Sequence, residues 1–343
     1  MKLFNPSGFA AFAFRQYDAE GQLDVVVSAR ACFLHKQGAT VARDRSADAF
    51  QWQDSYENDP YTSPLVIQSD LVPDKPGTDV TFLGESYCDD PPRSEWTCHL
   101  ALGPIAKELA VTGPRCWVKA KASAFSSKAP DWQPGAPEPA SSVPMDWRLT
   151  ARGDGTDAGT EHNPIGLNRP VEDGKDAEHP APQISILGDD RLEHPAGFAP
   201  VAPFWAGRAQ YAGTYDEAWT QTRHPLLPRD FDPRFWQCAP PDQIAMPYLR
   251  GDERYELTNL HPEYPVAKGQ LPGIDLAVRC ENNGADNWHI LNLDGVHFDW
   301  RETDRVSLTW RARFPLPDAM RAKLTLQRVT FVDAADVSEG ALA

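Results

Sequence analysis

The sequence has no apolar run long enough to cross a membrane and no cluster of lysine and arginine residues. A spanning helix needs about 20 consecutive apolar residues, and no stretch of the 343 residues approaches that length. Nucleic acids and anionic membranes are bound through basic residues that neutralise phosphates, yet the formal net charge is −16. We therefore expect a soluble protein whose partners are neither nucleic acid nor membrane.

Cysteine is also sparse, and none of the six cysteines lies in a CxxC pair of the kind that binds metals or undergoes redox exchange. The N-terminus lacks a secretory pattern, because Asn5, Pro6, Ser7 and Gly8 break its apolar stretch and no small-residue cleavage site follows. Scattered thiols without an export signal are most simply buried side chains in a reducing compartment. We expect a cytoplasmic protein that holds no metal and no cofactor.

Proline is abundant instead, with 32 residues, close to twice the usual share of roughly 5%. Prolines spread this evenly exclude long helices. Strand patterns dominate both ends of the chain. Phe12 and Phe14 alternate with small residues, Glu20-Gly21 marks a turn, and residues 23–35 continue as a β-branched and apolar run. This pattern predicts an N-terminal hairpin.

The predicted fold class is mainly β, with antiparallel sheets or β-sandwich-like lobes, a few short helices and long Pro/Gly-rich loops. Residues 1–125 would form an N-terminal β-rich lobe, and residues 184–343 a C-terminal β-rich lobe. Residues 126–183 are rich in Pro, Gly, Ala and Asp, which indicates a loop region between the lobes. One continuous domain is the alternative.

The most specific pattern lies in residues 212–243, where aromatic rings alternate with turn-forming prolines and charged residues. Thr214 followed three residues later by Glu217 is typical of a capping box, so a short helix is expected to begin there. Asp232 before Pro233 indicates an N-cap with proline in the first turn of a second, single-turn helix. The segment is thus predicted to form a helix–loop–helix shoulder.

The same segment offers one candidate catalytic group. Asp230, Asp232 and Asp242 near His224 would suit acid/base chemistry or hold a hard cation. The structural interpretation is simpler, because Asp232 is needed as an N-cap and Asp230 suits a turn after Pro228. We favour the structural interpretation and expect no catalytic residue here.

Motifs that define common enzyme classes do not occur in the sequence: it has no GxSxG elbow, Walker loop, HExxH pair or GxGxxG fingerprint. Asp294-Gly295 predicts a type I′ turn between two C-terminal strands. In that hairpin His289 and His297 would lie on opposite faces, so they could not bind one zinc ion. These observations favour a non-enzymatic protein.

A family resemblance is carried by the run GFAPVAPFWAGR…AGTYDEAW…PLLPRDFDPRFWQCAPPDQ…LRGDE. It resembles the domain-of-unknown-function 2169 family, and residues 69–85 (SDLVPDKPGTDVTFLGE) and 102–117 (LGPIAKELAVTGPRCW) resemble the family's N-terminal blocks. ELTNLHPEYPVAKGQLPG and VSLTWRARFPLP resemble its C-terminal ones. Genes of this family lie beside type VI secretion genes for VgrG spikes, PAAR-like tips and toxic effectors. The resemblance implies a cytoplasmic adaptor or chaperone that loads a PAAR-like effector onto the spike.

The resemblance also nominates partner-binding positions, and aromatic rings together with arginine have the composition of interface hot spots. For any single large ring, burial in the core is the more frequent fate. A PAAR-like effector is the expected partner, with the VgrG spike protein as a second. Two alternatives stay open: a β-sandwich hydrolase built on Asp230, Asp232 or His224, and a cargo or structural component of the apparatus. The candidate partner-binding residues are Trp205, Arg208, Tyr215, Asp216, Trp219, Asp230, Phe231 and Asp232.

Overall fold

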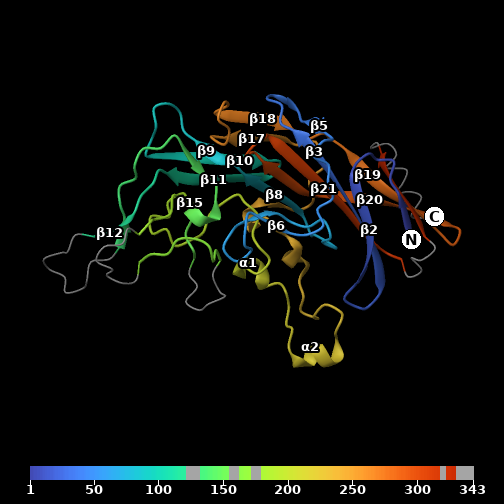
Figure 1. Ribbon diagram of the computed structural model, residues 1–343. Helices are drawn as coiled ribbons and strands as arrows, with labels where there is room; N and C mark the ends of the chain where they lie inside the picture. Colours follow the sequence, from blue (N-terminus) through green and yellow to red (C-terminus); the bar gives the residue numbers. More distant parts are fainter. Residues whose placement is uncertain (121–131, 154–161, 171–178, 317–321, 330–343) are drawn as a thin grey trace.

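The computed structural model describes residues 1–120, 132–153, 162–170, 179–316 and 322–329 (Figure 1). The predicted mainly β fold class is confirmed, since 44% of the described residues are in strands and 7% are in helices. The described helices are short. They are α1 (Ala206–Ala209), α2 (Glu217–Thr222) and three 3-10 turns, Trp147–Leu149, Pro233–Trp236 and Pro241–Gln243. Within the described ranges, none of the helices has the length and apolar character needed to span a membrane.

The larger sheet has ten strands. Its main path joins, in order, β1 (Lys2–Phe4), β22 (Lys323–Val329), β19 (Asp275–Asn282), β20 (Ala285–Asp299), β21 (Arg305–Pro315), β3 (Leu23–Leu34) and β2 (Ala10–Tyr17). Three further strands branch from it: β5 (Ala42–Asp44) on β3, β8 (Thr78–Leu83) on β20, and β16 (Ile244–Ala245) on β8. The first and last described strands, β1 and β22, pair in parallel.

The second sheet has six strands. In order they are β15 (Ile184–Ile186), β11 (Ile105–Thr112), β10 (Glu95–Leu102), β17 (Arg254–Thr258), β18 (Val266–Gln270) and β4 (Ala39–Thr40). Three two-stranded pairs complete the described strands. They are β12 (Trp117–Lys119) with β13 (Trp132–Pro134), β14 (Ser142–Pro144) with β9 (Glu85–Tyr87), and β6 (Ser55–Tyr56) with β7 (Leu65–Ile67).

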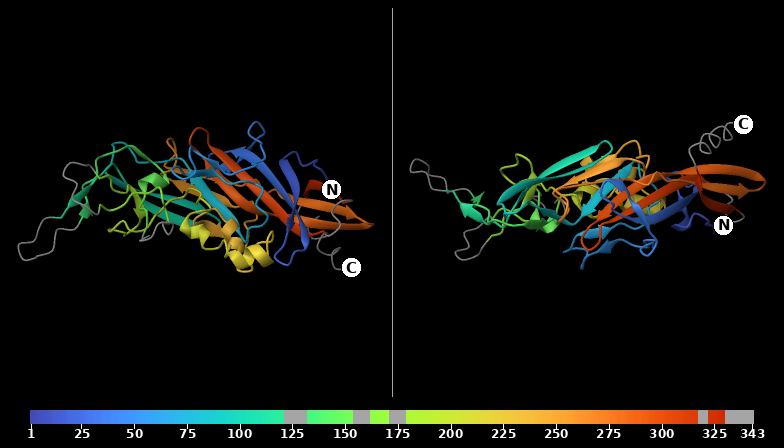
Figure 2. Two further views of the ribbon diagram at one scale, coloured as in Figure 1. Left: turned by 60° about the horizontal axis from the view of Figure 1, so that its bottom comes forward. Right: turned by 90° about the horizontal axis from the view of Figure 1, so that it is seen from above.

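One apolar cluster is built from both sheets. Alternate residues of β3, such as Val25, Val27 and Ala29, point into it because successive side chains of a strand face opposite sides. Leu100 and Leu102 of β10 enter the same cluster from the six-stranded sheet. Figure 2 shows an elongated molecule in which β10 and β11 lie toward one end and β19 and β20 toward the other. Strands from before residue 125 and after residue 184 pair within both sheets.

The predicted N-terminal hairpin is confirmed. β2 and β3 pair antiparallel from Ala10↔Arg30 to Tyr17↔Leu23. Gly21 in the connecting turn has a φ of 84°, which glycine adopts without the strain of a side chain. The alternation of aromatic and small residues therefore predicted this pairing correctly.

The predicted turn at Asp294-Gly295 is wrong. β20 continues through both residues as one strand of 15 residues, and its register with β21 shifts between Leu293 and Gly295 as in a β-bulge. The turn lies instead at Asn283-Gly284, where φ values of 49° and 83° are those of a type I′ hairpin between β19 and β20. Pairing on both sides of β20 overrides the local turn preference.

The position of this turn can be tested with two glycine substitutions. Gly284→Ala should destabilise the fold by about 1–2 kcal/mol, since a side chain at positive φ is strained. Gly295→Ala should change stability by less than about 0.5 kcal/mol, because the added Cβ would lie at an ordinary contact distance of 3.5 Å from Thr309. Urea unfolding measures both. Equal losses would contradict the assignment of the turn.

Candidate functional site

The segment that carries the family resemblance divides into a buried base and a projecting arm. We define the arm as residues 212–231, which include α2. Figure 1 shows α2 held away from both sheets on this arm. The candidate partner-binding residues are thus distributed over two different environments.

Trp205 and Arg208 belong to the base. Trp205 is 1% exposed, and its ring meets Trp147 edge-on at 5.6 Å between centroids. The Arg208 guanidinium is also buried, and it donates to the carbonyl oxygens of Phe235 and Val201. A buried guanidinium needs such acceptors. Both side chains therefore hold the base of the arm together inside the fold.

Tyr215 and Trp219 belong to the arm. Tyr215 is 52% exposed, and its ring lies edge-on to Trp219 at 4.7 Å. Trp219 is half-buried and donates its indole N–H to the carbonyl oxygen of Leu226 at 2.9 Å. The His224 ring also lies edge-on to Trp219, at 5.2 Å between centroids. Trp219 is thus fixed within the arm, whereas Tyr215 faces outward.

The helix in the arm begins later than the capping-box pattern predicted. Asp216 is the N-cap of α2, and its carboxylate accepts the backbone N–H of Trp219 at 2.8 Å. Thr214 donates its backbone N–H and its hydroxyl to the carboxylate of Asp230, at 3.0 and 2.7 Å. The local pattern missed this contact because Asp230 lies 16 residues further along the chain. The Thr214–Asp230 pair closes the two ends of the arm.

The predicted N-cap at Asp232 is confirmed. Its carboxylate accepts the backbone N–H of Arg234 at 2.9 Å, with Pro233 in the first turn of a 3-10 helix. The side chain of Arg234 donates to the same carboxylate. Phe231, just before the cap, packs its ring against Phe235 at 5.8 Å. Asp232 and Phe231 therefore anchor the return of the arm to the body.

The three aspartates considered for catalysis accept structural hydrogen bonds, and His224 packs its ring against Trp219. Hydrogen bonds from Thr214 lower the pKa of Asp230, and those from Arg234 lower the pKa of Asp232. A general acid at neutral pH needs a raised pKa, so neither carboxyl suits that role. Asp242 accepts the Lys107 ammonium at 2.9 Å, away from the arm.

In the part of the chain that the structure describes, no three His, Cys, Asp or Glu side chains come together in a way that could hold a metal ion. His289 and His297 lie on one strand, eight residues or about 26 Å apart. His289 stacks on Phe314 at 3.7 Å, whereas His297 is buried and hydrogen-bonded to Thr81. Burial lowers the pKa of His297 to about 4.

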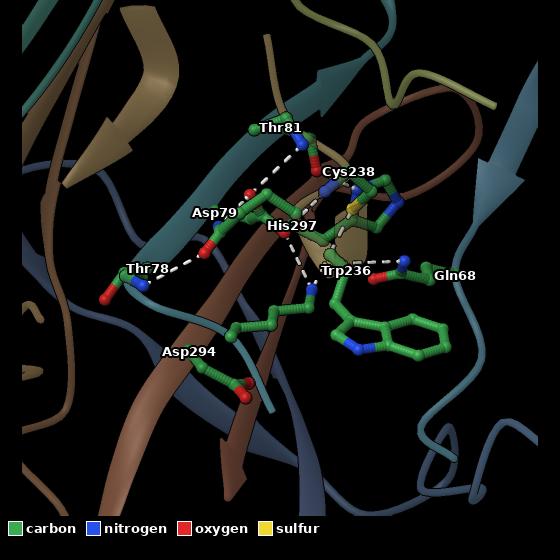
Figure 3. Close-up of polar contacts among 12 residues, drawn as sticks. Gln68, Thr78, Asp79, Thr81, Trp236, Cys238, Asp294 and His297 are labelled. Atoms are coloured by element: carbon green, nitrogen blue, oxygen red, sulfur yellow. Dashed lines mark hydrogen bonds and ion pairs between the residues drawn. The ribbon is translucent and has the colours of Figure 1, made fainter. Parts of the chain in front are cut away.

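A buried carboxylate, Asp79, is the polar centre that the sequence analysis missed (Figure 3). Asp79 accepts hydrogen bonds from the Lys75 ammonium at 2.7 Å and from the Gln237 side chain at 2.6 Å. The backbone N–H groups of Cys238 and Ala239 add two more, at 2.8 and 3.1 Å. Burial alone would raise the pKa of Asp79, but Lys75 and these donors hold it below its ordinary value.

Two glutamines extend this centre. Gln237 also accepts the backbone N–H of Gly77 at 2.9 Å. Gln243 is fully buried and donates to the carbonyl oxygens of Val80 and Phe198, at 2.7 and 3.1 Å. The chain that returns from the arm is therefore fastened to β8. The only signal for this in the sequence was two glutamines in a segment otherwise rich in proline and aromatic residues.

The Asp79 centre generates a stability prediction. Asp79→Asn would leave the Lys75 ammonium buried without a counter-ion, so we expect a loss of about 3–5 kcal/mol in the free energy of unfolding. Asp232→Asn is the matched control, because it breaks an exposed ion pair while asparagine still caps a helix. It should cost less than about 1 kcal/mol. Urea unfolding followed by tryptophan fluorescence measures both, and similar costs would refute a central role for Asp79.

A second prediction concerns the closure of the arm. Gly213 has a φ of 78°, and an added Cβ would lie 2.9 Å from Pro228 and 3.0 Å from the Asp230 carboxylate. Gly213→Ala should therefore open the arm and speed tryptic cleavage after Arg223 and Arg229. Gly207→Ala is the control, since its Cβ would meet no atom within 4 Å. If both variants are cleaved at the wild-type rate, Gly213 does not close the arm.

Comparison with known proteins supports the family resemblance carried by these segments. The comparison with curated proteins found no match. The comparison with solved structures likewise found none. The chain belongs to the family described as an uncharacterized protein conserved in bacteria (DUF2169), whose model matches residues 20–311.

Proposed function

We propose that the protein is a non-enzymatic accessory protein of type VI secretion, located in the cytoplasm. In this proposal it is an adaptor or chaperone that binds a PAAR-like effector and helps to load it onto the VgrG spike. The partner class follows from the resemblance of its motifs to the DUF2169 family. The proposal rests on the arm. Its exposed Tyr215 lies on a segment that the Thr214–Asp230 pair and the Trp219 indole bond hold in one conformation.

The geometry of the arm supports a role in protein binding. Tyr215 is 52% exposed and has a ring contact to a fixed neighbour, Trp219. Tyrosine and tryptophan are the residue types most enriched at interface hot spots. Because the Thr214–Asp230 pair and the Trp219 indole bond already order the arm, a partner would bind it at a low entropic cost.

The charge of the chain supports one feature of the partner. With a formal net charge of −16, the protein would attract a basic surface and speed the first encounter with it. The aromatic residues of the arm would then supply the affinity, since rim charges change association rates more than they change affinity. A basic effector surface is the complement that we propose.

The proposal is tested by co-expression with the PAAR-like protein encoded nearest to its gene, followed by affinity capture and size-exclusion chromatography. We expect the two proteins to co-elute, and the effector to be insoluble or degraded when expressed alone. Tyr215→Ala should weaken the complex roughly tenfold or more, as removal of a hot-spot ring does.

Tyr61→Ala is the matched control for this experiment. Tyr61 is 73% exposed and lies between β6 and β7, with its ring near Phe204. Its removal should leave the complex intact. An effector that stays soluble alone and never co-elutes would refute the chaperone function. A complex weakened equally by both variants would refute the arm as the binding surface.

A further inference from the structure

Three arginines lie near the loop that joins β1 to β2. Arg43 belongs to β5, Arg45 follows that strand, and Arg328 belongs to β22. The guanidinium carbons of Arg43 and Arg328 lie 4.8 and 4.5 Å from the centroid of one ring, that of Phe9. We call these three arginines the arginine cluster. None of them is part of the arm.

The main chain and the Phe9 ring hold two of these guanidinium groups in place. Arg43 donates to the carbonyl oxygen of Gly8 at 3.4 Å. Arg328 donates to the preceding carbonyl oxygen, that of Ser7, at 3.2 Å. The Phe9 ring that both groups cover is only 4% exposed, and a guanidinium over an aromatic face gains cation–π attraction. A buried ring and two carbonyl oxygens therefore form the floor of the cluster.

The cluster carries more positive charge than nearby carboxylates balance. Asp48 pairs with Arg43. Arg45 and Arg328 are exposed, and no carboxylate of the described residues lies within ion-pair distance of either. Burial and the charges of Arg43 and Arg45 lower the pKa of the Arg328 guanidinium, as like charges held close together do. Two guanidinium groups are therefore without a counter-ion at one place on a chain whose formal net charge is −16.

Other acidic residues do not cancel this local charge. Asp44 lies between Arg43 and Arg45 in the sequence. Its carboxylate accepts the Ser46 hydroxyl at 2.5 Å and pairs with Arg305 at 3.7 Å. Acidic residues elsewhere on the surface are largely screened, because the Debye length at physiological ionic strength is about 8 Å. An anion at the cluster is therefore attracted despite the acidity of the whole chain.

We propose that the arginine cluster is a docking surface for a short acidic segment of a partner protein. A carboxylate accepts two parallel N–H···O bonds from one guanidinium, so arginine is well suited to bind it. A nucleic acid would need many more phosphate contacts than two free guanidinium groups supply. The partner is opposite in charge to the basic surface proposed for the arm. The two surfaces would thus bind different partners, and this proposal does not depend on that for the arm.

The test measures the fluorescence anisotropy of a labelled hexaglutamate peptide that is titrated with the full chain at low ionic strength. A hexaglutamine peptide and a thymidine hexanucleotide with the same label are the comparison probes. We expect the hexaglutamate peptide to bind, and added salt to weaken it, because exposed charges are screened. The hexaglutamine peptide should not bind. Equal or tighter binding of the hexanucleotide would overturn the assignment to an acidic protein segment.

Three single substitutions locate the bound peptide. Arg45→Gln and Arg328→Gln should each weaken binding roughly three- to fivefold, the effect of losing one exposed ion pair. Arg254→Gln is the matched control, because it removes the same charge from an exposed position on β17, and it should leave binding unchanged. Arg45 is exposed and covers no ring of the described chain. Its variant therefore keeps the test decisive if Arg328→Gln does not fold.

Absence of binding to the hexaglutamate peptide would overturn the proposal. An equal loss of affinity in Arg254→Gln would show that the peptide responds to net charge alone, and unchanged affinity in Arg45→Gln would show that it binds elsewhere. Either result would likewise overturn it. Sedimentation equilibrium of the chain alone should show a monomer. A dimer that Arg45→Gln dissociates would mean that the acidic surface of a second copy occupies the cluster, and would overturn the assignment to a separate partner.

Discussion

The candidate site depends on the ion pair and the hydrogen bonds of the buried Asp79 carboxylate. It gathers the Lys75 ammonium, the Gln237 side chain and the backbone N–H groups of Cys238 and Ala239 around one point on β8. A buried charge is tolerated only when it is both paired and hydrogen-bonded. Because four donors from two distant segments converge here, the return of the arm is fixed against the larger sheet.

This fixed base explains how a short, exposed arm can hold one shape. The arm contains a helix of only six residues, too short to be stable alone in water. Its order comes from the Asp216 cap, the Thr214–Asp230 pair and the indole bond of Trp219 to the main chain. Trp205 and Arg208 belong to the same segment, but they are buried in the base and do not lie on the exposed arm. One aromatic-rich segment therefore serves two structural purposes.

The two Xaa-Gly pairs near the C-terminal strands show where local patterns stop being sufficient. Asn283-Gly284 and Asp294-Gly295 both have the residue types of a type I′ turn, yet only the first forms one. At the second, the strand continues with a bulge, and Asp294 is buried in an ion pair with Arg311. The two pairs carry the same local turn signal, so long-range strand pairing decides between them. Pairing along a whole strand contributes more free energy than a single turn does.

The sequence by itself determined the β class, the N-terminal hairpin and the cap at Asp232, because strand alternation and helix capping act between residues a few positions apart. It also marked the family through its motifs. Only the tertiary structure decided which aromatic residues are buried and which face outward, and it alone revealed the Asp79 centre. The physical reason is distance along the chain: Asp79 and Gln237 are separated by 158 residues. Their hydrogen bond exists only after the sheet has brought them together.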